Sequence, residues 1–239
     1  MFPQKLHHQE HNLPKEFSLL VWNVHKENLR SDFQERFKSL LQQHPSEFLL
    51  FQEAKYPKKS SSVLDDFSYA MASNIETFRH LYGVVTASKV AFEKIDSNLS
   101  HRREIGLITY KSMQITQHKL SNGQILHLVN LHSINFVSIK IFTKELEKIK
   151  LELKMCKGPM IVGGDFNNWT KKRIKVIEAF QHALSLEKAE LHEKHHIKHI
   201  FEKPLDHLFY RDLNLLQAKA IDTQKISDHN PIYATFSCI

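Results

Sequence analysis

The sequence is poor in cysteine and has no long apolar run. Cys156 and Cys238 are its only cysteines, which are too few for a disulfide framework and lack a CxxC spacing. We therefore expect a reducing compartment, the cytoplasm, although the pair leaves a single bridge open. No stretch reaches the roughly 18 apolar residues of a membrane span, and residues 1–17 lack the apolar core of a secretion signal. These absences predict a chain without a transmembrane segment or a conventional signal peptide, and they leave non-classical secretion open.

The sequence also lacks internal repeats and any stretch that resembles an interdomain linker. Its hydrophobic content of 41% and charged content of 25% are close to those of soluble globular domains, which excludes a disordered, collagen-like or membrane-embedded chain. A length of 239 residues allows one or two domains. We predict a polar N-terminal segment, residues 1–16, followed by a single domain, residues 17–239, and we expect a monomer.

Positive charge is in excess. The chain has 33 lysines and arginines against 26 aspartates and glutamates, a net charge of +7, and 17 histidines. A basic surface favours an anionic partner. Nucleic acid, phospholipid headgroups and small phosphorylated molecules all satisfy that description, and the charge alone does not choose among them.

Apolar periodicity predicts strands and helices that alternate early in the chain. Residues 17–22 and 48–51 are apolar runs typical of buried strands, and residues 29–43 between them have helical spacing. Asn122-Gly123 is a hairpin signal, so residues 113–120 and 124–131 should pair antiparallel. Further helices are predicted at 137–155 and 174–186, and further strands at 105–110, 160–162, 205–210, 213–220 and 232–236. The pattern predicts an α/β fold in which helices cover a sheet.

Polar side chains stand where the apolar runs end. They are Asn23, Glu53, His132, Asp165, Asn167 and the pair Asp228-His229. Side chains at strand ends converge on a common crevice in folds of this kind, so these positions could form one site. The alternative for each residue alone is capping or turn formation, since asparagine and aspartate are ordinary turn residues.

A series of motifs carries a resemblance to a known superfamily. VWNVHKEN, FLLFQEAK, REIGLITY, LVNLHSIN, IVGGDFNNW, PLDHLFYR and SDHNPIY resemble, in order, the motifs of the endonuclease/exonuclease/phosphatase (DNase I-like) superfamily of metal-dependent phosphoesterases. GDFNNW followed by KKR is most similar to an uncharacterised bacterial branch of it. The resemblance spans residues 18–236 and implies a four-layer α/β sandwich, in which two mostly antiparallel β-sheets pack face to face with helices outside.

The resemblance also implies a metal centre. Glu53 matches the principal metal-binding carboxylate of the superfamily, Asn23 lies beside it, and Asp228 matches a further acid on the metal side. Oxygen ligands of this kind suit Mg²⁺ or Mn²⁺ rather than zinc.

Five further positions match catalytic residues of the superfamily. His229 resembles the general base and Asp206 the aspartate that orients it. Asp165 resembles the residue that aligns the attacking water, Asn167 a donor to the phosphate, and His132 a histidine that contacts the scissile phosphate. A phosphodiester anion repels hydroxide, so neutral or cationic donors must hold its oxygens while a base activates water.

Several basic and aromatic residues are candidates for contact with an extended polyanion. Lys171, Lys172 and Arg173 follow the GDFNNW motif after one residue, Thr170. Trp169 could stack on a base at the edge of the site, and Arg103 could line the approach. The alternatives are a solvated helix start for the basic residues and packing against the sheet rim for Trp169.

One motif points elsewhere. Residues 192–196 satisfy the HExxH pattern of zinc proteases, but the segment lacks a clear buried helical face, so we interpret it as a solvated helix or loop. The sequence as a whole predicts a Mg²⁺- or Mn²⁺-dependent phosphodiesterase that uses in-line attack of water, most consistent with a DNA or RNA endonuclease. The alternatives are a phospholipid or inositol-phosphate phosphoesterase and an inactive nucleic-acid-binding module.

Overall fold

The structure is a computed structural model of the chain. It describes residues 4–58, 64, 66–98, 112–200 and 203–239. Arg103 and the predicted strand 105–110 lie outside the described residues. Within that part, Cys156 and Cys238 are free thiols, and no helix is long and apolar enough to cross a membrane.

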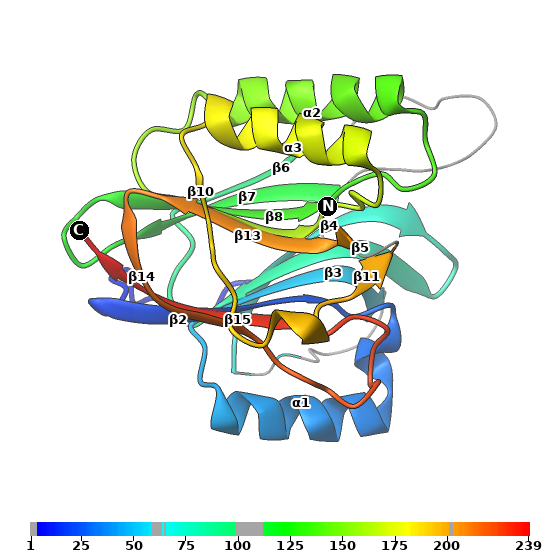
Figure 1. Cartoon of the computed structure of the whole chain (residues 1–239). Helices are drawn as coiled ribbons and strands as arrows, with labels where there is room; N and C mark the ends of the chain where they lie inside the picture. The colour runs from blue at the N-terminus through cyan, green and yellow to red at the C-terminus, as the bar shows by residue number, and fades with distance from the viewer. Residues whose placement is uncertain (1–3, 59–63, 65, 99–111, 201–202) are drawn as a thin grey trace.

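Two large β-sheets pack face to face in the centre of the molecule (Figure 1). The seven-stranded sheet has the order β1 (Gln4–Lys5), β4 (Ser68–Glu76), β5 (His80–Ser88), β3 (Phe48–Pro57), β2 (Glu16–Asn23), β15 (Ile232–Cys238) and β14 (Leu213–Ala220). The six-stranded sheet has the order β10 (Glu187–Lys188), β13 (Asp206–Arg211), β9 (Met160–Asp165), β8 (Ile125–His132), β7 (Ser112–Lys119) and β6 (Lys94–Asn98). A small hairpin pairs β11 (His199–Ile200) with β12 (Lys203–Pro204).

Helices cover the outer face of each sheet. Figure 1 shows α1 (Ser31–Gln43) against the seven-stranded sheet, and α2 (Ile139–Leu153) and α3 (Lys171–Ala183) against the six-stranded one. Short 3-10 turns are η1 (Glu27–Leu29) and η2 (Lys194–His196). The chain thus forms the α/β sandwich that the resemblance predicted.

Alternation along the central strands builds the layers. In β2, Leu19 and Val21 face the core between the sheets, while Leu20 and Trp22 face α1, because successive side chains of a strand point to opposite faces. Trp22 stacks on Phe33 of α1, with ring centroids 4.8 Å apart. The apolar run at 17–22 therefore reflects a strand buried on both faces, as in a sheet covered on each side.

Most predicted elements form, with shifted boundaries. β7 and β8 pair antiparallel, with Lys119 opposite Ile125, and Gly123 has a φ of 86° in the turn. The predicted helix 174–186 begins earlier, at Lys171, because the side chain of Thr170 accepts a hydrogen bond from the Arg173 N–H at 3.1 Å. Such a cap satisfies a backbone donor that the helix start leaves unpaired.

The domain boundary at residue 17 stays a prediction. The preceding segment makes contacts of its own, since β1 pairs with β4 and Leu13 is buried in the core between the sheets.

Two parallel pairs decide where the strand ends lie. β2 runs parallel to β3, with Asn23 opposite Gln52, and β8 runs parallel to β9, with His132 opposite Asp165. The antiparallel strand β13 begins beside the end of β9, with Asp206 opposite Asp165. The polar residues that end these strands are consequently brought to one edge of the sandwich.

Candidate active site

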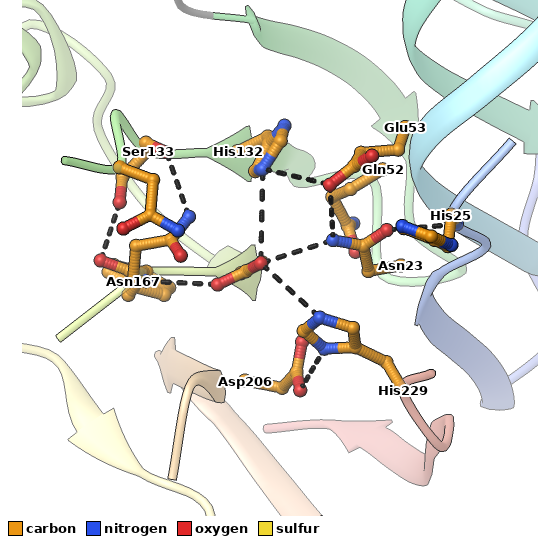
Figure 2. Close-up of polar contacts among 12 residues, drawn as sticks. Asn23, His25, Gln52, Glu53, His132, Ser133, Asn167, Asp206 and His229 are labelled. Carbon is orange, nitrogen blue, oxygen red and sulfur yellow. Dashed lines mark hydrogen bonds and ion pairs between the residues drawn. The ribbon is translucent and has the colours of Figure 1, made fainter. Parts of the chain in front are cut away.

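The site lies at this edge, where eight sequence-predicted residues from both sheets gather. Figure 2 shows most of them as one network of polar contacts. The contributing segments are the end of β2, a bulge in β3, the ends of β8 and β9, the start of β13, and the loops after β9 and β14. The residues are Asn23, Glu53, His132, Asp165, Asn167, Asp206, Asp228 and His229.

His229 and Asp206 form a buried pair. The Nδ1 atom of His229 lies 2.8 Å from Oδ2 of Asp206, and the two side chains are 4% and 5% exposed. Burial by itself lowers the pKa of His229, but attraction to the Asp206 carboxylate and the hydrogen bond with it outweigh burial, so the pKa is raised. With Nδ1 committed to Asp206, Nε2 faces the centre of the site, 3.7 Å from Oδ2 of Asp165.

The backbone of His229 is fixed as well. Its carbonyl accepts a hydrogen bond from Trp22 Nε1 at 2.8 Å, and its N–H donates to Ser227 Oγ at 3.3 Å. Ser227 Oγ in turn donates to the Asn23 carbonyl at 2.8 Å. The loop after β14 is therefore held against the end of β2.

Asp165 contacts Asn23, Asn167, His132 and His229 and so occupies the centre of the network. Its Oδ1 accepts the Asn167 N–H at 2.9 Å, and its Oδ2 accepts from Asn23 Nδ2 at 3.1 Å. The preceding Gly164 has a φ of 147°, and a Cβ there would lie 1.8 Å from the Leu131 carbonyl oxygen. Only glycine permits this close approach, which explains the second glycine of the GGD sequence.

Glu53 lies on a bulge of β3. The register with β5 shifts between Phe51 and Ala54, and Glu53 adopts a φ of 51°, a conformation that non-glycine residues hold mainly where the fold imposes it. Gln52 stays buried, and its amide nitrogen donates to Asn130 at 2.8 Å. The bulge thus presents Glu53 to the site without exposing its neighbour.

Positive charge keeps Glu53 ionised. Burial by itself raises the pKa of the carboxyl, but His132 and Lys26 outweigh it and lower the pKa to about 2. Lys26 Nζ lies 3.0 Å from Oε2, and His132 Nε2 lies 3.8 Å from Oε1. Asn23 Nδ2 donates to the same Oε1 at 3.3 Å.

Asn23 and Asn167 act as connectors within the site. The amide nitrogen of Asn23 donates to Glu53 and to Asp165. Its amide oxygen accepts the His25 N–H at 3.0 Å. The role of this oxygen as a metal ligand stays a prediction. Asn167 has a φ of 48°, and its Nδ2 donates to the Ser133 carbonyl at 3.1 Å. His132, which precedes Ser133 in the chain, has its Nε2 3.8 Å from Asp165 Oδ2.

Asp228 forms the outer side of the site. It is 41% exposed and pairs with Lys198. Its Oδ1 is 3.9 Å from His229 Nε2, and its Oδ2 is 4.0 Å from His25 Nε2. His25 and Asp228 also line an adjoining cleft of about 570 Å³, together with Arg30, Lys225 and others.

Three basic residues near the site were not singled out by sequence. His25 and Lys26 stand two and three positions after Asn23 in the WNVHKEN motif, so their position after a buried strand was an available signal. Lys198 precedes β11, and its sequence neighbourhood carries no such signal; only the fold brings it to Asp228.

The donors present fit a hard divalent cation. Glu53 is an ionised carboxylate, and Asp165 and Asp228 supply further carboxylate oxygens, the ligand type that Mg²⁺ and Mn²⁺ prefer. Among the described residues, Asp165, Asp206 and His229 also bring one ligand atom each to within 4.8 Å of one another. A cation at that cluster would compete with the hydrogen bond between Asp206 and His229 for the same side-chain atoms.

Arg173 corrects the predicted set of substrate contacts. Its side chain is 2% exposed, and its guanidinium donates to three carbonyls, those of Asn167 at 2.7 Å, Val137 at 2.9 Å and Ile134 at 3.3 Å. The prediction that Arg173 contacts substrate is therefore wrong, because its donors are spent on the protein's own backbone. Lys171 and Lys172 are exposed and Trp169 is half-buried, while Arg103 lies outside the described residues.

The HExxH segment does not form a zinc site. Glu193 has a φ of 55°, and η2 is a 3-10 helix of three residues, so the two histidines of the pattern do not share one face of an α-helix. The solvated interpretation agrees with the exposure of His192, while the second histidine of the pattern, His196, is half-buried.

Known proteins share sequence with this chain. The sequence profile of the Endonuclease/Exonuclease/phosphatase family matches residues 20–229. A UPF0294 protein of Vibrio parahaemolyticus is 33% identical over 224 residues, which cover 93% of this chain and 78% of that protein.

Solved structures share the fold at low identity. An endonuclease/exonuclease/phosphatase from Beutenbergia cavernae superposes with a TM-score of 0.71 at 11% identity, covering 94% of this chain and 72% of that one. TDP2 of D. rerio, crystallised with a single strand DNA product, superposes with a TM-score of 0.69 at 17% identity, covering 94% and 100% of the two chains. The family profile and the sequence relative together establish that this chain belongs to the endonuclease/exonuclease/phosphatase family.

Proposed function

We propose that this protein is a metal-dependent phosphodiesterase that cleaves DNA or RNA as an endonuclease, by in-line attack of water. The observation that carries the proposal is the buried His229–Asp206 pair, whose free ring nitrogen faces Asp165 at 3.7 Å where the strand ends meet. A general base needs a fixed tautomer, a basic nitrogen and access to the reacting atom. Here Asp206 fixes the tautomer of His229 and makes its free nitrogen more basic.

In the proposed reaction, Asp165 orients a water molecule against His229. Nε2 of His229 takes a proton from this water while the water oxygen attacks phosphorus. The bond from phosphorus to the leaving oxygen breaks in the same step. The raised pKa of His229 makes it a stronger proton acceptor than free imidazole, and Asp206 stabilises the imidazolium that forms.

The phosphate must approach a site that already holds carboxylates. His132 and Asn167 lie where they could donate to non-bridging oxygens, which offsets the repulsion from Glu53 and Asp165. Glu53, with Asn23 beside it and Asp228 on the outer side, would hold Mg²⁺ or Mn²⁺, which when bound neutralises negative charge on the phosphate and on the leaving oxygen.

Charge supports nucleic acid as the substrate. The chain carries a net charge of +7, and the exposed Lys171 and Lys172 begin α3 directly after the Asn167 loop. A polyanion gains affinity from each phosphate that such residues neutralise. The D. rerio TDP2 structure with a single strand DNA product is an example of this fold in complex with nucleic acid.

A substrate screen tests the proposal. Purified protein is incubated with plasmid DNA, single-stranded RNA, sphingomyelin, phosphoinositides and a generic phosphodiester, each with Mg²⁺, Mn²⁺ or EDTA. We expect nucleic acid cleavage that EDTA abolishes. Turnover of a lipid or inositol phosphate without nuclease activity would select the first alternative, and metal-independent binding without turnover would select the inactive module.

Two substitutions assign the activity to this site. Glu53→Gln and His229→Ala should each lower kcat/KM on the cleaved substrate by about 10²- to 10⁴-fold, because each removes a group that acts in the transition state. Glu76→Gln is a matched control, since its carboxylate pairs with Lys58 on the surface. Unchanged metal-dependent cleavage in both site variants would show that the activity arises elsewhere.

A further inference from the structure

Two aromatic side chains lie together on the surface beside the site. Phe136 is 86% exposed and Trp169 is half-buried, and their ring centroids are 6.4 Å apart with 43° between the ring planes. We call this pair the aromatic platform. An exposed phenylalanine next to a tryptophan costs solvation, which a binding partner for the rings would recover.

Both rings stand on loops that carry site residues. Phe136 lies in the loop after β8, which includes Ser133, and Trp169 lies in the loop after β9, which includes Asn167. The two loops are joined at the site itself, since Asn167 Nδ2 donates to the Ser133 carbonyl at 3.1 Å. The platform therefore adjoins the place where the phosphate is expected.

Asn135 ties the two rings together. Its Oδ1 accepts from Trp169 Nε1 at 2.9 Å and from the Phe136 N–H, also at 2.9 Å. Phe136 has a φ of 48°, a left-handed conformation that bulky residues rarely adopt. Strain of this kind persists only where the surroundings impose it, and it concentrates at functional sites.

The buried side chain of Arg173 packs against the Trp169 ring of the platform. The same guanidinium that binds carbonyls of both loops lies 5.0 Å from the Trp169 ring centroid and 4.5 Å from that of Phe142. A buried cation that stacks on an aromatic ring and bridges two loops limits their movement. The platform is thus preorganised, which lowers the entropic cost of binding.

The surroundings favour a nucleobase over a lipid tail. Lys171 and Lys172 are exposed two and three positions after Trp169, at the start of α3, so positive charge stands close to Trp169 along the chain. A nucleotide presents a flat base and an anionic phosphate close together, which matches that pairing, and base stacking on aromatic side chains is tolerant of sequence. A lipid tail would need a longer apolar surface than two rings flanked by Asn135 and lysines.

We propose that the aromatic platform stacks a nucleobase next to the scissile phosphate and so positions the nucleic acid in the site. This proposal rests on the proposed nuclease function and names Phe136 as a substrate contact. It also specifies how Trp169 takes part, as one half of a surface that Arg173 holds in place.

Binding in EDTA tests the platform separately from catalysis. Fluorescence anisotropy is measured with a labelled oligothymidylate and with an abasic oligomer of the same length, whose bases are replaced by hydrogen. Phe136→Ala should weaken binding of the oligothymidylate about tenfold, the value of one stacked base, and leave binding of the abasic oligomer unchanged. Phe78→Ala is the matched control, because Phe78 is 93% exposed in the turn between β4 and β5.

Tryptophan emission gives an independent readout. Trp22 is buried and Trp169 is the only other tryptophan, so oligothymidylate should quench the emission of Trp169. Trp169→Phe should remove that quenching while keeping a ring that can stack. Persistent quenching in Trp169→Phe would overturn the proposal.

The outcomes separate the two proposals. Equal losses for both oligomers, or no loss in Phe136→Ala, overturn the platform even if the protein cleaves DNA. A preference for bases that Phe136→Ala abolishes, in a protein that cleaves no nucleic acid, supports the platform and overturns the nuclease function. If Phe136→Ala loses binding to phosphatidylglycerol vesicles but keeps binding to both oligomers, the platform is overturned in favour of a membrane contact.

Discussion

Asp206 and His229 are almost completely buried, and each contacts the other at 2.8 Å. A buried carboxylate is costly unless it has such a partner, and an imidazole in this position would be less basic without the charge beside it. The burial of the Asp206 carboxylate and the basicity of His229 therefore depend on each other, and a single substitution can test this.

Asp206→Asn tests this dependence at the residue scale. The amide oxygen can still accept the Nδ1 hydrogen, but the negative charge that stabilises the imidazolium is lost, so kcat should fall about 10²- to 10⁴-fold. Steady-state kinetics on the substrate found in the screen measure the effect. Asp212→Asn is the control, because Asp212 is 59% exposed and follows the other end of β13. A rate equal to that of the wild type in Asp206→Asn would refute the role of Asp206.

At the scale of elements, α3 shows how a helix start changes the role of a residue. The sequence KKR suggests three equivalent basic residues, but the Thr170 cap places Arg173 on the same buried face as Ile177 and Phe180. Residues at this spacing share one side of a helix. Lys171 and Lys172 remain on the surface as the sequence predicted, while Arg173 turns inward.

We predict that Arg173→Met destabilises the protein. The methionine can fill part of the volume, but the carbonyls of Ile134, Val137 and Asn167 would lose their donors, which should lower the free energy of unfolding by about 3 kcal/mol. Urea unfolding followed by circular dichroism measures this. Lys172→Met should change it by less than about 0.5 kcal/mol. Equal stability of the two variants would mean that water replaces the guanidinium at no cost.

At the scale of the whole molecule, the sandwich encloses histidines that have no part in the site. His118 is completely buried; its Nδ1 donates to the Ala91 carbonyl at 3.1 Å, and its Nε2 lies 3.0 Å from Thr116 Oγ1. His207 is buried against Phe166 and Phe209. Burial is the largest cause that lowers the pKa of each, to about 3 in both cases. Both residues are therefore neutral in the folded protein at neutral pH.

These histidines predict acid sensitivity with a definite sign. The unfolded chain takes up a proton at each position near pH 6.5 while the folded protein does so only near pH 3, so stability is lost as the pH falls through this window. The slope should be about 1.4 kcal/mol per pH unit for each histidine. Urea unfolding at a series of pH values measures it. His118→Met should reduce the slope and the control His195→Gln should not; a flat profile would contradict the buried neutral state.

Much of the site was predictable because its chemistry is local in sequence. Glu53, His132 and Asp165 follow apolar runs closely and His229 precedes one, so these residues could be found from the sequence and from the resemblance. Apolar runs likewise indicated strands such as β2, β9 and β15, but they did not indicate β4, β5 or β6. Boundaries were less exact, since a cap such as Thr170 adds a turn that periodicity alone does not reveal.

The sequence by itself thus determined the family, the α/β sandwich and the kind of groups at the strand ends. Only the tertiary structure decided which of those groups touch, that Lys26 and Lys198 join them, that Arg173 is buried, and that Phe136 lies beside Trp169. The physical reason is that these relations depend on contacts between distant segments, such as Trp22 with the His229 carbonyl across 207 positions. Local patterns specify the elements, whereas packing of the elements specifies which way each side chain faces.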